Sequence, residues 1–111
     1  MSGITSHVLD TSVGKPAAGV HVSLHIKTDS DWEVVGEGIT NDDGRVPSLT
    51  GDACEAGHYQ ITFAVADYFV AQGVSSFYPV VRIEFTVTDG SQHYHVPLLL
   101  NPFGFSTYRG S

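Results

Sequence analysis

The sequence has little cysteine and little charge, and each shortage excludes a class of protein. Cys54 is the single cysteine, which excludes an internal disulfide framework and any zinc site built from several cysteines. Charged residues make up only 15% of the chain, and 5 Lys and Arg stand against 12 Asp and Glu, for a formal net charge of −7. Because nucleic-acid binding draws much of its affinity from clustered cations, we expect no nucleic-acid partner.

Long apolar runs are also missing. The longest ones fall far short of the roughly 18 residues that a membrane-spanning helix needs, so we expect no membrane partner. No apolar leader stretch follows Met1, which favours a cytoplasmic protein, or a peroxisomal one if the source is eukaryotic. With 111 residues the chain is long enough for one ordinary core, and we expect a single domain over residues 1–111.

Alternation of apolar and polar residues is the dominant pattern that is present. It is clearest over residues 20–26, 59–65 and 81–87, where every second residue is apolar. A period of two predicts strands that turn one face toward a core and the other toward solvent or a neighbouring subunit.

Turn-forming residues separate these strands, most clearly at 41–44 and 89–91. One short helix is predicted over 68–72, with Asp67 as its N-cap and Gly73 as its left-handed terminator. The sequence therefore predicts an all-β fold: a two-sheet antiparallel β-sandwich of seven to eight strands with one short helix.

Six histidines stand out in a chain so poor in charge, because His is the side chain best suited to move protons near neutral pH. His7 and Leu9 are predicted to point outward from the first strand. His95 and Leu99 share the outer face of the strand over 92–100. Apolar residues beside histidines on an outer face indicate a covered surface, such as a groove or a subunit interface.

The histidines also have interpretations other than catalysis. His93 and His95 lie two residues apart, a spacing that also suits a metal pair, but no spaced carboxylate or thiol completes such a site. We therefore expect no metal. For His21, His25 and His58 we expect surface histidines without a role.

The C-terminal segment 106–111 is rich in hydroxyl groups and contains an aromatic ring. Chain ends fray unless contacts hold them. The sequence leaves two possibilities open here: an ordered last strand, or an edge strand with a frayed end.

Several motifs together resemble the transthyretin-like 5-hydroxyisourate hydrolases. The most specific is the C-terminal tetrapeptide, which the hormone-carrying transthyretins of the same fold lack. Those carriers also have a lysine at the position of His7, which favours the enzyme. The matching segments span nearly the whole chain: residues 6–10, 16–17, 19–20, 40–45, 77–79, 93–100 and 108–111.

The resemblance implies two four-stranded sheets and a homotetramer, a dimer of dimers with active sites in the channel between dimers. It implies an enzyme that hydrolyses a cyclic amide, converting purine-derived 5-hydroxyisourate to 2-oxo-4-hydroxy-4-carboxy-5-ureidoimidazoline in urate degradation, with no cofactor. Carried over by position, the catalytic residues are His7, Arg45, His95 and Ser111. The substrate-binding residues are His7, Arg45, Tyr108, Arg109, Gly110 and Ser111.

These residue types suit the reaction, since hydrolysis needs an activated water and stabilisation of the oxyanion that forms. We expect His7 and His95 to position and deprotonate water and to pass protons to the departing ring nitrogen. The sequence leaves open which of them is the base. Arg45 is expected to orient a carbonyl through its planar fork of donors, and Tyr108 and Ser111 to line the pocket.

Two other function classes stay open from the sequence. A carrier of an aromatic ligand would have the same fold and channel, although His7 and the terminal motif argue against it. A purely structural or adhesion domain is the third class, and the lack of disulfides and linkers argues against that one. Turnover separates an enzyme from a carrier, whereas affinity for an aromatic ligand does not.

Overall fold

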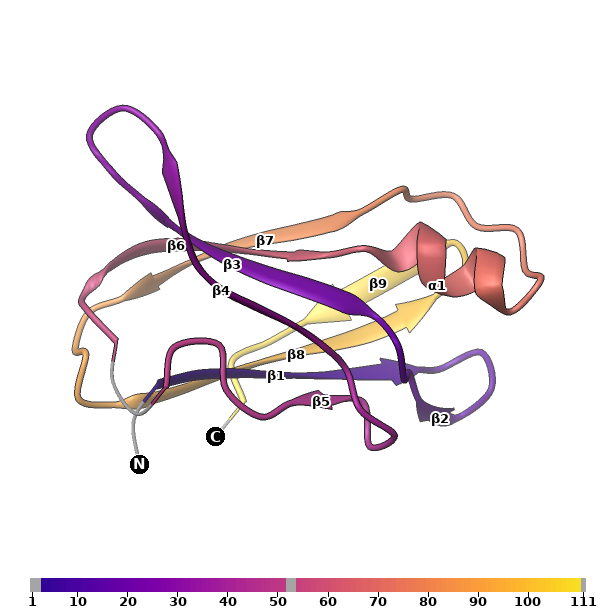
Figure 1. Cartoon of the computed structure of the whole chain (residues 1–111). Coiled ribbons are helices and arrows are strands. Elements are labelled where there is room, and N and C mark those ends of the chain that lie inside the picture. The colour runs from indigo at the N-terminus through magenta and orange to yellow at the C-terminus, as the bar shows by residue number, and fades with distance from the viewer. Residues whose placement is uncertain (1–2, 52–53, 111) are drawn as a thin grey trace.

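The computed structural model describes residues 3–51 and 54–110, and within them it contains nine strands and one helix (Figure 1). The elements in chain order are β1 (Gly3–Asp10), β2 (Lys15–Pro16), β3 (His21–Lys27), β4 (Trp32–Ile39), β5 (Arg45–Val46), β6 (Gly57–Phe63), α1 (Val65–Ala71), β7 (Val81–Val87), β8 (His93–Asn101) and β9 (Gly104–Thr107). The count exceeds the predicted seven to eight because β2 and β5 have only two residues each.

The strands form two layers, which confirms the predicted two-sheet sandwich (Figure 1). One sheet has the order β4-β3-β6-β7, and the other has the order β2-β1-β8-β9 with β5 also paired to β1. Because β5 and β2 pair with successive parts of β1, the second sheet has five strands where the resemblance implied four.

One strand pair departs from the antiparallel pattern. Among the described strands, β1 and β8 alone run parallel, from the pair Gly3–His93 to the pair Asp10–Leu100. Only a hairpin forces antiparallel direction, and these two strands are separated by the whole of the other sheet. The parallel pair lies at the centre of its sheet and positions the candidate site.

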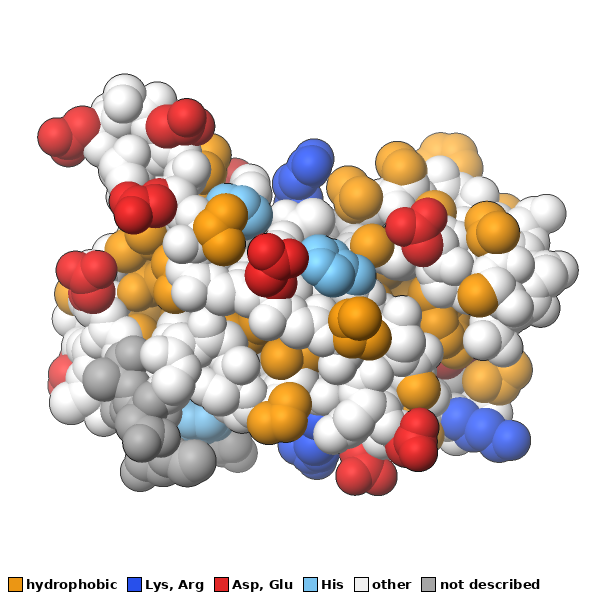
Figure 2. Space-filling view, in the orientation of Figure 1, with side chains coloured by type: hydrophobic (Ala, Val, Ile, Leu, Met, Phe, Trp, Pro, Cys, Tyr) orange, Lys and Arg blue, Asp and Glu red, His pale blue; other side chains and the backbone are white. Residues whose placement is uncertain are grey.

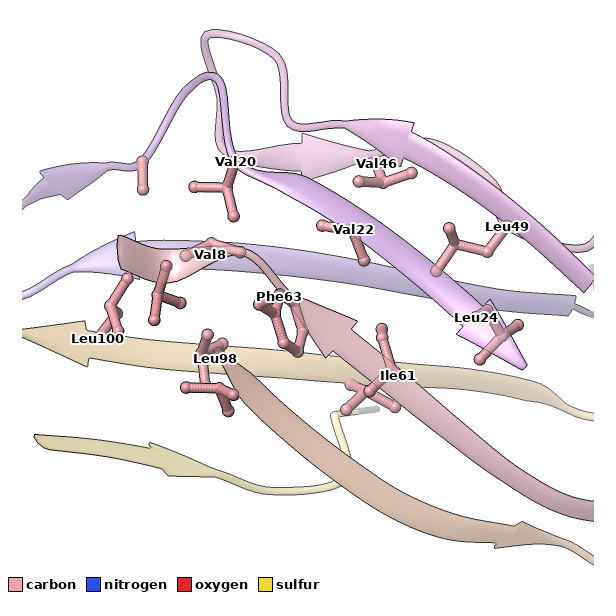
Figure 3. Close-up of a cluster of buried hydrophobic side chains, with 14 of the residues drawn as sticks. Val8, Val20, Val22, Leu24, Val46, Leu49, Ile61, Phe63, Leu98 and Leu100 are labelled. Atoms are coloured by element: carbon pink, nitrogen blue, oxygen red, sulfur yellow. The ribbon is translucent and has the colours of Figure 1, made fainter. Parts of the chain in front are cut away.

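The core lies between the sheets, as the alternation predicts. Ile4 and Val8 of β1 are fully buried, and so are two alternate apolar residues of β3 and three of β6: Val22, Leu24, Tyr59, Ile61 and Phe63. Ile26, the last inward residue of β3, is partly buried. In Figure 3 the labelled side chains from both sheets meet in one cluster: Val8, Val20, Val22, Leu24, Val46, Leu49, Ile61, Phe63, Leu98 and Leu100.

The helix begins earlier than predicted. Val65, predicted as the last inward residue of a strand, is the first residue of α1, and Asp67 lies in the first turn instead of at the cap. Burial of Val65, Tyr68 and Phe69, which share one helix face, holds the helix in place. Gly73 has φ of +70°, so the predicted left-handed terminator is confirmed.

A buried hydrogen bond joins α1 to β1. The Tyr68 hydroxyl donates to Oδ2 of Asp10 at 2.8 Å, and Asp10 is only 3% exposed. Burial, together with the hydrogen bond to this carboxyl group, raises the pKa of Tyr68 to about 12. The contact fixes the helix against the strand that carries His7.

Among the charged groups of the surface, acidic ones outnumber basic ones. On the face shown in Figure 2, Asp and Glu side chains are widely spread and Lys and Arg side chains are few. In the described ranges, none of the helices has the length and apolar character needed to cross a bilayer.

Candidate active site

The outer face of the β1–β8 sheet arranges its side chains in rows. Residues opposite each other on paired strands point to the same face. Thr5 lies opposite His95 and His7 lies opposite Pro97 across the parallel pair. On the other edge of β1, Arg45 of β5 lies opposite His7. Residues from three distant segments are thereby neighbours on one surface.

Three half-buried imidazoles are neighbours on this surface. The ring centroids of His7 and His95 are 6.4 Å apart at an interplanar angle of 26°. Those of His93 and His95 are also 6.4 Å apart, at 13°. The His95 ring is therefore a neighbour of both other rings.

The Thr5 hydroxyl joins two of these rings. Its Oγ1 lies 2.8 Å from Nδ1 of His95 and 3.1 Å from Nε2 of His93, both hydrogen-bond distances. Sequence reasoning missed Thr5 as a site residue, because a lone threonine belongs to no catalytic motif. Only its place two residues before His7, on the same strand face, could have drawn attention to it.

A hollow of about 270 Å³ opens beside these groups. Arg45 and His95 both line it, one from the β5 side and one from β8. Its full lining is Thr5, Ser6, Arg45, Val46, Pro47, His93 and His95. Polar groups that can donate hydrogen bonds therefore meet at an accessible cavity.

The surroundings of His95 favour its neutral form by lowering its pKa. Burial lowers its pKa, and the neighbouring charge of Arg45 and the other two histidines lower it further. A neutral imidazole has one N–H donor and one lone pair, so it can donate at one nitrogen and accept at the other near neutral pH.

The C-terminal segment returns to this site. The Gly110 N–H donates to the backbone oxygen of His95 at 2.8 Å. A Cβ at position 110 would lie 2.6 Å from Cδ2 of the His95 ring, so only glycine fits there without moving the ring. The chain end forms the edge strand β9, which ends at Thr107, and Gly110 forms an isolated bridge with His95 beyond it.

Tyr108 and Arg109 lie differently from the histidines. The Arg109 guanidinium stacks over the ring of Tyr94, with its carbon 4.5 Å from the ring centroid, and Nη2 donates to Oε1 of Gln92 at 3.1 Å. Tyr108, 59% exposed, lines with Arg109 a second, mostly apolar hollow of about 240 Å³. Ser111, a predicted catalytic residue, lies outside the described residues.

Two other histidines pair with carboxylates on the other sheet. His21 pairs with Glu37 at 3.0 Å and His58 with Glu84 at 2.7 Å, all four side chains being about half exposed.

Burial raises the pKa of the Cys54 thiol, which keeps it a poor nucleophile. Among residues 3–51 and 54–110, no group of three or more His, Cys, Asp or Glu side chains is arranged so that it could hold a metal ion.

Fold and site together define the class of protein: a two-sheet β-sandwich with a histidine and arginine cluster on the outer face of one sheet. The model of the HIUase/Transthyretin family matches residues 4–110. The 5-hydroxyisourate hydrolase of Deinococcus radiodurans is 50% identical over 114 residues, which cover 98% of this chain and 96% of that protein. The chain belongs to the HIUase/Transthyretin family, which confirms the resemblance drawn from the motifs.

Solved structures include both branches of the family. The 5-hydroxyisourate hydrolase of Klebsiella pneumoniae superposes with a TM-score of 0.88 at 35% identity, covering 99% of this chain and 100% of that chain. The transthyretin of Sparus aurata superposes with a TM-score of 0.92 at 29% identity, covering 99% and 97%. The backbone alone therefore does not distinguish the hydrolase from the transthyretin. That distinction depends on the side chains of the site.

Proposed function

We propose that this protein hydrolyses 5-hydroxyisourate to 2-oxo-4-hydroxy-4-carboxy-5-ureidoimidazoline. The observation that carries the proposal is the cluster of His7, His95 and Arg45. His95 and Arg45 line one hollow, His7 is the neighbour of both, and Gly110 packs on His95. The names of similar proteins from Deinococcus radiodurans and Klebsiella pneumoniae support the same substrate.

The reaction needs one water and no redox step. The water oxygen bonds to a ring carbonyl carbon, the carbon–nitrogen bond of the cyclic amide breaks, and a proton reaches the departing nitrogen. Two half-buried imidazoles with centroids 6.4 Å apart can contact the same small group from two sides. This spacing supports the roles proposed for His7 and His95, which are to activate the water and move its proton.

Arg45 provides the fixed positive charge at the hollow. Its planar guanidinium can give two parallel hydrogen bonds to a carbonyl of the planar substrate. The same charge stabilises the oxyanion formed when water attacks. Gly110 belongs to the proposed site through its contact with His95. Tyr108 and Arg109 line the second hollow, and their proposed role in substrate binding, like that of Ser111, comes from the family resemblance.

Turnover tests the proposal directly. Uricase generates fresh 5-hydroxyisourate, and its ultraviolet decay is followed with buffer, with the protein and with the His7→Ala variant. We expect faster decay with the protein and a rate near that of buffer with the variant. Decay no faster than buffer from folded protein would overturn the hydrolase and favour an aromatic-ligand carrier, like the transthyretin of Sparus aurata in fold.

We also propose a homotetramer formed by two dimers. Leu9 and Leu99 are directly paired in register and are half-buried on the same outer face as the histidines, where a second subunit would remove them from water. Native mass spectrometry measures the assembly, and a monomer at micromolar concentration would contradict it. The proposed location is the cytoplasm, which cell fractionation tests.

A further inference from the structure

One hydroxyl group couples two imidazoles in this site. Thr5 Oγ1 lies within hydrogen-bond distance of both Nδ1 of His95 and Nε2 of His93. A hydroxyl has one hydrogen and two lone pairs, so it either donates to one ring and accepts from the other or accepts from both rings. The proton positions on the two rings therefore depend on each other through Thr5.

Accepting from both rings would leave the Thr5 hydrogen without an acceptor among the described residues, so two arrangements of neutral rings remain. In the first, His93 Nε2–H donates to Thr5, and Thr5 donates to His95 Nδ1, which leaves the His95 proton on Nε2. In the second, His95 Nδ1–H donates to Thr5, and Thr5 donates to His93 Nε2. The His93 proton is then on Nδ1, and Nε2 of His95 has a lone pair. The first arrangement makes His95 a hydrogen-bond donor toward the hollow, whereas the second makes it a base.

Two observations favour the first arrangement. Nδ1 of His93 is buried and lacks a hydrogen-bond partner within the described part of the chain. A buried N–H without a partner is rarer than a buried acceptor without one, so the His93 hydrogen belongs on Nε2. The contact from Thr5 to His95 is also the shorter of the two, 2.8 Å against 3.1 Å, as expected where the hydroxyl is the donor.

We propose that Thr5 is a positioning residue that holds His95 as a neutral imidazole with its proton on Nε2. The inference rests on the proposed hydrolase function. In this form His95 donates a hydrogen bond to the substrate oxygen on which negative charge develops, as neutral imidazoles can. His7 then takes the proton from water and returns it to the departing nitrogen, so that neither ring gains a net proton over the cycle.

A second observation favours His95 as a hydrogen-bond donor. Arg45 and burial both oppose a positive charge on His95, and a base must take up that charge. A neutral donor does not change its charge during the reaction.

Long-range ¹H–¹⁵N spectra of the labelled protein near neutral pH test the proton positions without any substrate. His93→Gln and His95→Gln variants assign the rings. We expect His95 to be protonated on Nε2, with a hydrogen-bonded lone pair on Nδ1. In Thr5→Val the Nδ1 resonance should move to that of a nitrogen without a hydrogen bond, and in Thr5→Ser it should stay. A wild-type His95 protonated on Nδ1, or an unchanged Nδ1 resonance in Thr5→Val, would overturn the proposal.

Kinetics test whether the coupling matters. We expect Thr5→Val to lower kcat about tenfold with little change in KM, and Thr5→Ser to restore most of the rate. Thr62→Val, a matched change on the outer face of the other sheet, should leave kcat unchanged. Wild-type kcat in Thr5→Val would overturn the positioning role. Absence of turnover in every protein, wild type included, would instead overturn the hydrolase function, and the spectra would still report the tautomer.

Discussion

The α-carbon of Gly110 lies against the imidazole of His95, so closely that a Cβ there would be 2.6 Å from Cδ2 of the ring. The backbone adds a hydrogen bond of 2.8 Å from the Gly110 N–H to the His95 oxygen. The C-terminal segment therefore packs against the candidate active site, and Gly110 limits where the His95 ring can lie.

Gly110→Ala should displace the His95 ring. We expect kcat to fall by about tenfold to 10²-fold, because small displacements of a catalytic group cost that much, while thermal unfolding changes little. Gly104→Ala is the matched control in the preceding hairpin, where a Cβ meets only ordinary contacts beginning at 3.6 Å. Equal rates for both variants would show that the glycine contact does not position the ring.

His95→Asn should lower kcat on the order of 10²-fold or more, because it removes a group that acts on the transferring proton or the oxyanion. His58→Asn makes the same change at an exposed ring on the other sheet and should keep the wild-type rate. Native mass spectrometry checks that both variants keep the wild-type assembly. An unchanged rate in His95→Asn would remove this residue from the mechanism.

Arg45→Gln should raise the pKa of His95. Burial is the larger cause of the low pKa and the guanidinium adds to it, so the substitution recovers part of the shift and not all of it. Removing a neighbouring positive charge makes protonation easier, and the titration of the His95 ring should therefore move to higher pH. NMR titration of the free protein measures this, and a shift to lower pH would contradict the assignment.

Tyr68→Phe should destabilise the fold by about 1–3 kcal/mol, because it deprives the buried Asp10 carboxyl of a donor. Tyr78→Phe, which keeps its ring contacts with Phe77 and Phe105, is the control. Urea unfolding at neutral pH measures both. A free energy of unfolding equal to that of wild type in Tyr68→Phe would show that this hydrogen bond contributes nothing net.

The same tyrosine predicts a pH dependence. Its pKa rises from 10 to about 12 in the folded protein, so the stability linked to this group is fully present below pH 10 and is lost as the pH rises through 12. Wild-type stability should fall more steeply than that of Tyr68→Phe across this window. Parallel pH profiles for the two proteins would contradict the shifted pKa.

Much of the site could be anticipated from the sequence, though by two different routes. Alternation alone places His7 and His95 on outer strand faces, and both are half-buried there. Arg45 follows a turn and has no pattern of its own, so only the family resemblance pointed to it. Thr5 could not be found by either route, since its role depends on two rings 88 and 90 residues away.

The sequence by itself determined the inward faces of the long strands, because side-chain alternation is a local property of the chain, and its motifs determined the family by resemblance. Tertiary structure alone decided that β1 and β8 run side by side in parallel, that Thr5 joins His93 to His95, and that Arg109 stacks on Tyr94. An alternation with a period of two shows which face of its strand a residue occupies. It does not show which strand lies next to that strand. The neighbour is set by how the two sheets close over one core, and the chemistry of this site depends on that neighbour.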